Sequence, residues 1–165
     1  MASKKKKKSK KQETHGHVIA DNRRARHRFE ILQQVECGIM LIGSEVKSIR
    51  EGNISLNEAY VRVEEGELWL IGADIKEYRQ ASFWNHKPKR SRKLLVHKSE
   101  LQKLSAKAFE KGLTLVPLKM YFNARGIVKV LVGVGRGKKL HDKRQSLKEA
   151  DNKRRLSREM RERLK

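Results

Sequence analysis

The stretch TLVPLKMYFNARGIVKVLVGVG, residues 114–135, decides the fold class because it contains two strand-like runs joined by a short turn. The second run alternates, as in a strand with one buried side, and places four valines on one face: Val128, Val130, Val132 and Val134. Asn123 to Gly126 join the two runs, so we predict an antiparallel hairpin. Pro117 has no N–H to donate to a ladder and is expected at an edge or a bulge.

Strand patterns also precede this hairpin. FEILQQVECGIMLIG, residues 29–43, predicts either two strands or one long bent strand, with Gly38 as a bulge or bend. AYVRVEEGELWLIGADI, residues 59–75, alternates around Glu65 and Gly66 and predicts a second hairpin. KLLVH, residues 93–97, predicts a short strand.

Two segments have helical patterns. SEVKSIREG, residues 44–52, predicts about two turns of helix with Ser44 as the N-cap and Gly52 at the end. SELQKLSAKAFEKG, residues 99–112, predicts a longer helix that Ser99 caps and Gly112 ends. Its expected apolar stripe consists of Leu101, Leu104, Ala108 and Phe109.

These elements indicate a mainly β fold with two to three helices. Successive strands are joined too closely for the crossover helices that a parallel sheet needs, so we predict a small OB-like β-barrel. We expect one domain at residues 18–137, flanked by a disordered basic arm at residues 1–17 and a basic tail at residues 138–165.

The charge points to a polyanionic partner. The 165 residues contain 41 Lys and Arg against 19 Asp and Glu, a net charge of +22. The excess is +6 in residues 1–17, +9 in residues 18–136 and +7 in residues 137–165, so more than half of it lies on the two ends. Such a chain repels itself unless a polyanion compensates the charge, and nucleic acid is the leading candidate.

The sequence lacks the signatures of disulfide-bonded, membrane-spanning, metal-binding and nucleotide-binding proteins. Cys37 is the single cysteine, which excludes an intramolecular disulfide and argues against a Cys-based zinc site. No apolar run is long enough to span a membrane, and no signal-peptide core follows the first lysines, so a cytoplasmic protein is expected. The six His are scattered, and GVGRGKK, residues 133–139, lacks the ending of a phosphate loop. We therefore expect no metal, no cofactor and no catalytic activity.

The last segment, residues 138–165, has too few apolar side chains to hold a helix against the barrel. Acid-before-base pairs at four-residue spacing, such as Glu149 with Lys153, favour helix by roughly a few tenths of a kcal/mol each. The tail is expected to be unfolded in the free protein and to become helical on a phosphate-lined surface.

Six motifs in order resemble the small protein B family, the SsrA-binding proteins of bacterial trans-translation. They are NRRARHRFEIL, VECGIMLIGSEVKSIREG, AYVRVEEGELWL, NHKPKRSRKLLVHKSEL, KGLTLVPLKMYF and GKKLHDKR. The resemblance implies an OB-like barrel that binds the tRNA-like domain of transfer-messenger RNA (tmRNA). It also implies a tail that occupies the decoding centre of the small subunit and the empty mRNA channel of a stalled ribosome. We expect a monomer.

The resemblance also assigns residues to these two tasks. The barrel residues that match the family's RNA contacts, with two neighbouring arginines, are Asn22, Arg23, Arg24, Glu36, Leu95 and Lys129. The tail residues that match its strand-exit and decoding-centre motifs are Gly137, Lys138, Lys139, His141, Asp142, Lys143 and Arg144.

Some alternatives stay open at this point. Leu95 has apolar neighbours, so core packing is an equal interpretation, and Lys129 alone would be an ordinary surface lysine. Arg26 and His27 beside Asn22, and Arg90, Arg92 and Lys93 in the long loop, are further candidates for phosphate contacts. For the whole protein, the alternative is a basic ribosomal or RNA-chaperone-type OB protein without a rescue role.

Overall fold

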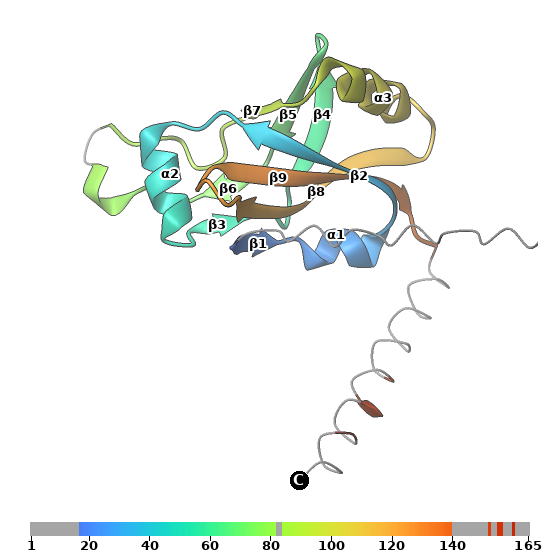
Figure 1. Cartoon of the computed structure of the whole chain (residues 1–165), viewed down its shortest axis with the longest axis horizontal. Helices are drawn as coiled ribbons and strands as arrows, with labels where there is room; N and C mark the ends of the chain where they lie inside the picture. Colours follow the sequence, from blue (N-terminus) through green and yellow to red (C-terminus); the bar gives the residue numbers. More distant parts are fainter. Residues whose placement is uncertain (1–16, 82–83, 140–151, 153–154, 157–159, 161–165) are drawn as a thin grey trace, which may run out of the picture.

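The structure is a computed structural model that describes residues 17–81, 84–139, 152, 155–156 and 160. The strands in this part of the chain are β1 Val18–Asp21, β2 Phe29–Ile39, β3 Ile54–Ser55, β4 Tyr60–Glu64, β5 Glu67–Ile71, β6 Asp74–Ile75, β7 Arg92–Leu95, β8 Leu113–Phe122 and β9 Val128–Gly137. The helices are α1 Arg23–Arg28, α2 Gly43–Arg50, the short 3-10 helix η1 Arg79–Ala81, and α3 Lys98–Ala108 (Figure 1).

Antiparallel strands close into a barrel. Around the ring they follow the order β8, β4, β5, β7, β2 and β9, and β9 pairs back onto β8. Strand β1 is added to β8 outside the ring, while β3 and β6 form a separate two-stranded sheet. Within residues 17–81 and 84–139, a small strand-rich barrel with three α-helices confirms the predicted OB-like, mainly β fold.

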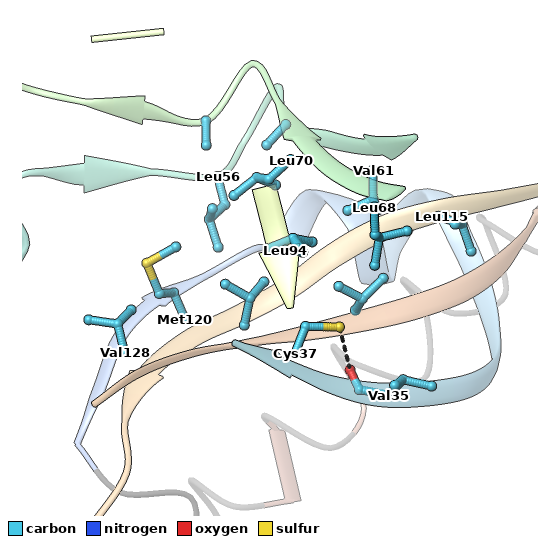
Figure 2. Close-up of a cluster of buried hydrophobic side chains, with 14 of the residues drawn as sticks. Val35, Cys37, Leu56, Val61, Leu68, Leu70, Leu94, Leu115, Met120 and Val128 are labelled. Carbon is cyan, nitrogen blue, oxygen red and sulfur yellow. Dashed lines mark hydrogen bonds between the residues drawn. The ribbon is translucent and has the colours of Figure 1, made fainter. Parts of the chain in front are cut away.

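The barrel interior is filled by alternate residues of its strands. Figure 2 shows Val35 and Cys37 of β2 among leucines and valines of the facing strands, with the Cys37 thiol directed at the Val35 carbonyl. All four valines of the predicted stripe on β9 are buried in this core, as expected: Val128, Val130, Val132 and Val134. Burial raises the pKa of the Cys37 thiol to about 12, so the thiol is inert at neutral pH.

Both predicted hairpins are confirmed. In the first, Glu65 and Gly66 have positive φ values of 50° and 73°, the geometry of a two-residue turn between β4 and β5. In the second, β8 and β9 pair along their length with one register shift, between Pro117 and Lys119. Pro117 therefore lies at a bulge, as its missing N–H requires.

Strand β2 differs from the prediction in where it is irregular. Gly38 is paired with both Lys129 and Leu95, so it is neither a bulge nor a bend. The register shift lies between Ile31 and Gln33 instead. At Gly38 a β-carbon would lie 3.3 Å from the Leu95 Cβ, so this glycine marks a close approach of two strands.

The helix starts were also predicted incorrectly. The N-cap of α2 is Ile42, whose N–H donates to the Glu45 carboxylate at 2.9 Å, and Ser44 lies inside the helix. The N-cap of α3 is His97 rather than Ser99, because the helix begins at Lys98, soon after β7. Phe109, expected in the apolar stripe, follows the last turn of α3 and is 79% exposed.

Candidate nucleic-acid interface

A hollow of about 680 Å³ opens on the outer face of the barrel where β2, β7 and β9 meet. Glu36, Leu95 and Lys129 all line it, one from each strand. The alternation of the strands explains their direction: because Val35, Leu94 and Val130 face the core, the residues next to them face outward. Three of the predicted site residues, distant in the sequence, therefore meet at one place.

Glu36 and Lys129 of the hollow are already paired with each other. Lys129 Nζ lies 3.5 Å from Glu36 Oε1, and the Tyr121 hydroxyl donates to Glu36 Oε2. The Glu36 side chain is still 45% exposed, so its carboxylate has room to accept further hydrogen bonds. Leu95 is 49% exposed, so of the two interpretations that its sequence allowed, core packing is wrong. The hollow thus offers an acid, a base and an apolar side chain to one ligand.

Asn22 is held inside the protein. Its Nδ2 donates to the carbonyl oxygens of Leu56 and Pro117 at 2.9 and 3.0 Å, and its Oδ1 accepts from the Ala25 N–H at the start of α1. The residue is 2% exposed and both of its amide hydrogens are used. Asn22 therefore fixes the start of α1 and does not present its own amide to a ligand.

Helix α1 was not predicted from the sequence, and it lies on the outside of the barrel beside β1 (Figure 1). It is pinned there by Ala25, which packs in an outer apolar cluster that also contains Val116, Leu118, Tyr121 and Leu131. Arg23 and Arg24 are exposed, whereas Arg26 forms an ion pair with Asp21 at 3.1 Å. Leu131 belongs to the outer cluster and also lines the hollow, so the helix and the hollow are neighbours.

The exit of β9 is tied to the same helix. Gly137 ends the strand opposite Phe29, and the Lys138 N–H donates to the Arg28 carbonyl at 2.9 Å. Lys138 Nζ reaches the Arg26 carbonyl at 3.3 Å, and Lys139 is exposed. The other predicted tail residues, His141, Asp142, Lys143 and Arg144, lie outside the described residues, as do positions 1–16 of the basic arm.

Three cations of the long loop and of strand β7 after it already have carboxylate partners. Arg92 is fully buried and donates to Glu45 Oε1 at 2.8 Å, while Arg90 donates to both Glu45 oxygens at 2.7 and 2.6 Å. Lys93 pairs with Glu67. Arg92 is therefore corrected from a phosphate contact to an internal partner of Glu45, because it is fully buried. Arg90 and Lys93, whose side chains are 32% and 34% exposed, have carboxylate partners that sequence spacing does not reveal.

Glu45 is the residue that the sequence analysis missed. It is fully buried on α2 and links that helix to the loop before β7. Burial alone raises the pKa of its carboxyl, but the hydrogen bonds from Arg90 and the Ile42 N–H, with the charge of Arg92, outweigh burial and hold this pKa below its ordinary value. Burial lowers the pKa of Arg92, and the Glu45 charge opposes that shift. The sequence offered no sign of this role, since Glu45 occurs among ordinary helix residues.

Comparison with known proteins identifies the relatives of this chain. The SmpB protein family matches residues 19–162. This chain belongs to the SmpB protein family. The SsrA-binding protein of Rhodopirellula baltica is 57% identical over 143 residues, covering 87% of this chain and 81% of that protein. The SsrA-binding protein of Microcystis aeruginosa is 52% identical over 144 residues, covering 87% of this chain and 93% of that one.

A solved structure described as "tmRNA-SmpB: a journey to the center of the bacterial ribosome" is similar as well. It has a TM-score of 0.62 and 53% sequence identity, and the match covers 73% of this chain and 84% of that one. Within residues 17–81 and 84–139 of this SmpB-family chain, His, Cys, Asp and Glu form no group of three that could hold a metal ion. In the part of the chain that the structure describes, no helix is long and apolar enough to cross a membrane.

Proposed function

We propose that this protein binds the tRNA-like domain of tmRNA and delivers it to stalled bacterial ribosomes. The observation that carries the proposal is the meeting of Glu36, Leu95 and Lys129 in one hollow, on the barrel of a chain whose relatives are SsrA-binding proteins. A folded RNA is recognised through unpaired bases as well as phosphates. An acid and an apolar side chain beside a lysine suit such a target, whereas a purely basic patch would serve any polyanion.

The two tasks are divided between the barrel and its extension in this proposal. The barrel, residues 18–137, holds tmRNA through the hollow and through Arg23 and Arg24, which Asn22 and α1 position. The tail, residues 138–165, begins at the edge of α1 and enters the decoding centre and the mRNA channel.

Within the tail, the His141 ring stacks on a base of ribosomal RNA and Asp142 accepts hydrogen bonds from base amines or ribose hydroxyls. Lys143 and Arg144 neutralise neighbouring phosphates. The protein acts by binding alone, without a catalytic step, in the cytoplasm where ribosomes translate.

A competition measurement tests the part of the proposal that concerns the barrel. The affinity for the isolated tRNA-like domain is expected to exceed the affinity for an ordinary tRNA, and to fall steeply with salt because lysine and arginine displace counterions from phosphates. Equal affinity for the two RNAs would contradict the proposal.

Truncation after Lys139 tests the division of tasks. The shortened chain is expected to bind the tRNA-like domain as the full chain does, while peptide tagging on stalled ribosomes is lost. Replacement of Asp142, Lys143 and Arg144 by Ala in the full-length chain should have the same effect, which separates these side chains from the length of the tail. Loss of RNA binding on truncation would show that the division is wrong.

The ribosomal-protein alternative predicts a different behaviour during purification. A constitutive ribosomal protein stays on the subunit through a high-salt wash, whereas a delivery factor is released.

A further inference from the structure

Trp84 is the most exposed large apolar side chain in the part of the chain that the structure describes, with 91% of its surface in contact with water. It lies in the loop between β6 and β7, of which residues 76–81 and 84–91 are described. An indole ring offers more flat apolar surface than any other side chain. A ring that is left almost entirely in water adds little to the core and is accessible to a ligand.

The backbone that carries Trp84 is held by hydrogen bonds. The Asn85 side chain closes the loop on itself, because its Oδ1 accepts from the Tyr78 N–H at 3.1 Å and its Nδ2 donates to the Tyr78 carbonyl at 2.9 Å. The Trp84 N–H donates to the Ala81 carbonyl at 3.2 Å. A ligand that stacks on the ring therefore has little of the loop left to order.

The residues that follow attach the loop to the body of the protein. His86 is buried, its Nε2 donates to the Ile75 carbonyl, and its Nδ1 lies beside the Ser44 hydroxyl of α2, both at 3.0 Å. Further along the loop, Arg90 is bound by Glu45 of the same helix. The loop is thus a fixed platform with an aromatic ring on its surface.

The loop is also strongly basic around this ring. Residues 76–91 contain five Lys and Arg and a single acid, Glu77. The exposed cations are Lys76, Arg79, Lys87 and Lys89. An exposed aromatic ring between cations is the arrangement with which proteins hold single-stranded nucleic acid, since the ring stacks on a base while the cations neutralise phosphates. An apolar pocket of another protein would match the ring but not the charges.

The loop adjoins the hollow and is remote from the tail. Arg90 Nη2 donates to the Met40 carbonyl at 3.4 Å, and Met40 is two residues beyond Gly38, which lines the hollow. Figure 1 shows the loop beside α2, on the side of the barrel away from the end of β9, where the tail begins. An RNA that is held at the hollow can therefore continue onto the loop without meeting the tail.

We propose that Trp84 is a stacking platform for one unpaired base of tmRNA, at a contact separate from the hollow, and that Arg79, Lys87 and Lys89 neutralise the phosphates on either side of that base. Stacking uses the face of a base and leaves its edge unread, so the contact adds affinity without a sequence preference. The proposal rests on the proposed function, because it adds a second contact with the same RNA.

Substitutions at position 84 test the platform. The affinity of the full-length protein is measured for a full-length tmRNA transcript. Trp84→Ala is expected to weaken binding roughly tenfold, and Trp84→Leu by as much because it has no flat ring, whereas Trp84→Tyr should stay within about threefold of the unaltered protein. All three variants should keep their melting temperature, because the replaced ring is exposed.

Salt dependence separates stacking from charge. The slope of log affinity against log salt should be the same for Trp84→Ala as for the unaltered protein, because no phosphate contact is removed, and shallower for Lys87→Gln. Phe109→Ala is the matched control. It removes an exposed ring from the end of α3 and is expected to leave the affinity unchanged.

Fluorescence reports on the ring directly. The chain contains two tryptophans, so Trp69→Phe leaves Trp84 as the single indole. Its emission is expected to be quenched when the tmRNA transcript is added, because a stacked base quenches an indole.

The outcomes separate the two proposals. Equal affinity of Trp84→Ala and the unaltered protein for tmRNA would overturn the platform and leave the proposed function intact. Tight binding by Trp84→Leu, a loss of equal size in Phe109→Ala, or unchanged Trp84 emission at saturating tmRNA would also overturn it. Failure of the unaltered protein to bind tmRNA would contradict the proposed function itself.

Discussion

Replacement of Glu45 by glutamine tests whether the buried ion-pair network holds α2 to the loop before β7. The carboxylate is fully buried and accepts four hydrogen bonds, from the Arg90 Nε and Nη2, the Arg92 Nε and the Ile42 N–H, at distances between 2.6 and 2.9 Å. Glutamine has the same shape, but its NH2 group replaces one acceptor with a donor and leaves Arg92 buried without a counter-charge.

The expected cost follows from that uncompensated charge. Removing one partner of a buried, hydrogen-bonded ion pair costs about 3–5 kcal/mol, a large share of a typical stability of roughly 5–15 kcal/mol. For a domain of this size such a loss lowers the melting temperature by roughly 10–20 °C. Urea unfolding followed by circular dichroism measures the free energy, and calorimetry measures the melting temperature.

Three comparisons make the result specific to the network. Glu51→Gln removes a carboxylate at the exposed end of the same helix and is expected to cost less than about 0.5 kcal/mol. Arg90→Met should lower the free energy of unfolding less than Arg92→Met does, because the Arg90 side chain is 32% exposed and the Arg92 side chain is fully buried. The double variant Glu45→Leu with Arg92→Met should be more stable than Arg92→Met alone. A Glu45→Gln protein within about 1 kcal/mol of the unaltered one would refute the reasoning.

Three more predictions concern Glu45 again and two other buried groups, Asn22 and Cys37. Because the pKa of Glu45 is lowered on folding, the unfolded chain takes up the proton first as the pH falls. The network therefore stabilises the fold above about pH 4.3, and its contribution is lost as the pH drops through the folded-state pKa. Urea titrations between pH 3 and 6 should show that the free energy of unfolding falls less steeply with decreasing pH in Glu45→Gln than in the unaltered protein, and equal slopes would contradict this. Asn22→Asp should destabilise the fold at least as much as Asn22→Ala, by roughly 2–3 kcal/mol, because a carboxylate would face the two carbonyls to which the amide now donates. Thermal melts measure this, and an Asn22→Asp variant with unchanged stability would disprove it. The Cys37 thiol, with its pKa raised to about 12, should react with a thiol reagent at pH 8 only when the barrel opens, so rapid labelling of the native protein would show that the core is looser than its 1% exposure implies.

Local periodicity was sufficient to predict the barrel. The alternation in residues 59–75 and 114–135 predicted both hairpins, because side chains of a strand point to opposite faces whatever surrounds them. The bulge at Pro117 followed for a similar reason, since a missing N–H is a property of the residue itself. Helix starts were less predictable: Ser44 and Ser99 have the chemistry of N-caps, but the helices begin earlier, at positions set by the preceding strands.

The site was only partly accessible from the sequence. Motifs singled out Glu36, Leu95 and Lys129, and whether Leu95 faced the core or the solvent was decided only by the pairing of β7 with Gly38 of β2. The same limit explains why Asn22 was expected to meet a ligand with its own amide. Its hydrogen-bond partners, Leu56 and Pro117, are 34 and 95 positions away along the chain.

By itself, the sequence determined the class of fold, the polyanionic partner and the family, because strand alternation, net charge and ordered motifs are properties of residues and their near neighbours. Tertiary structure alone decided which charges are free. Arg92, which composition places among the basic contacts, is neutralised by Glu45 from 47 positions away, while Glu36 and Lys129 stay at an accessible surface. The physical reason is that a charge must either reach water or find a partner, and only the closed barrel determines which of the two it meets.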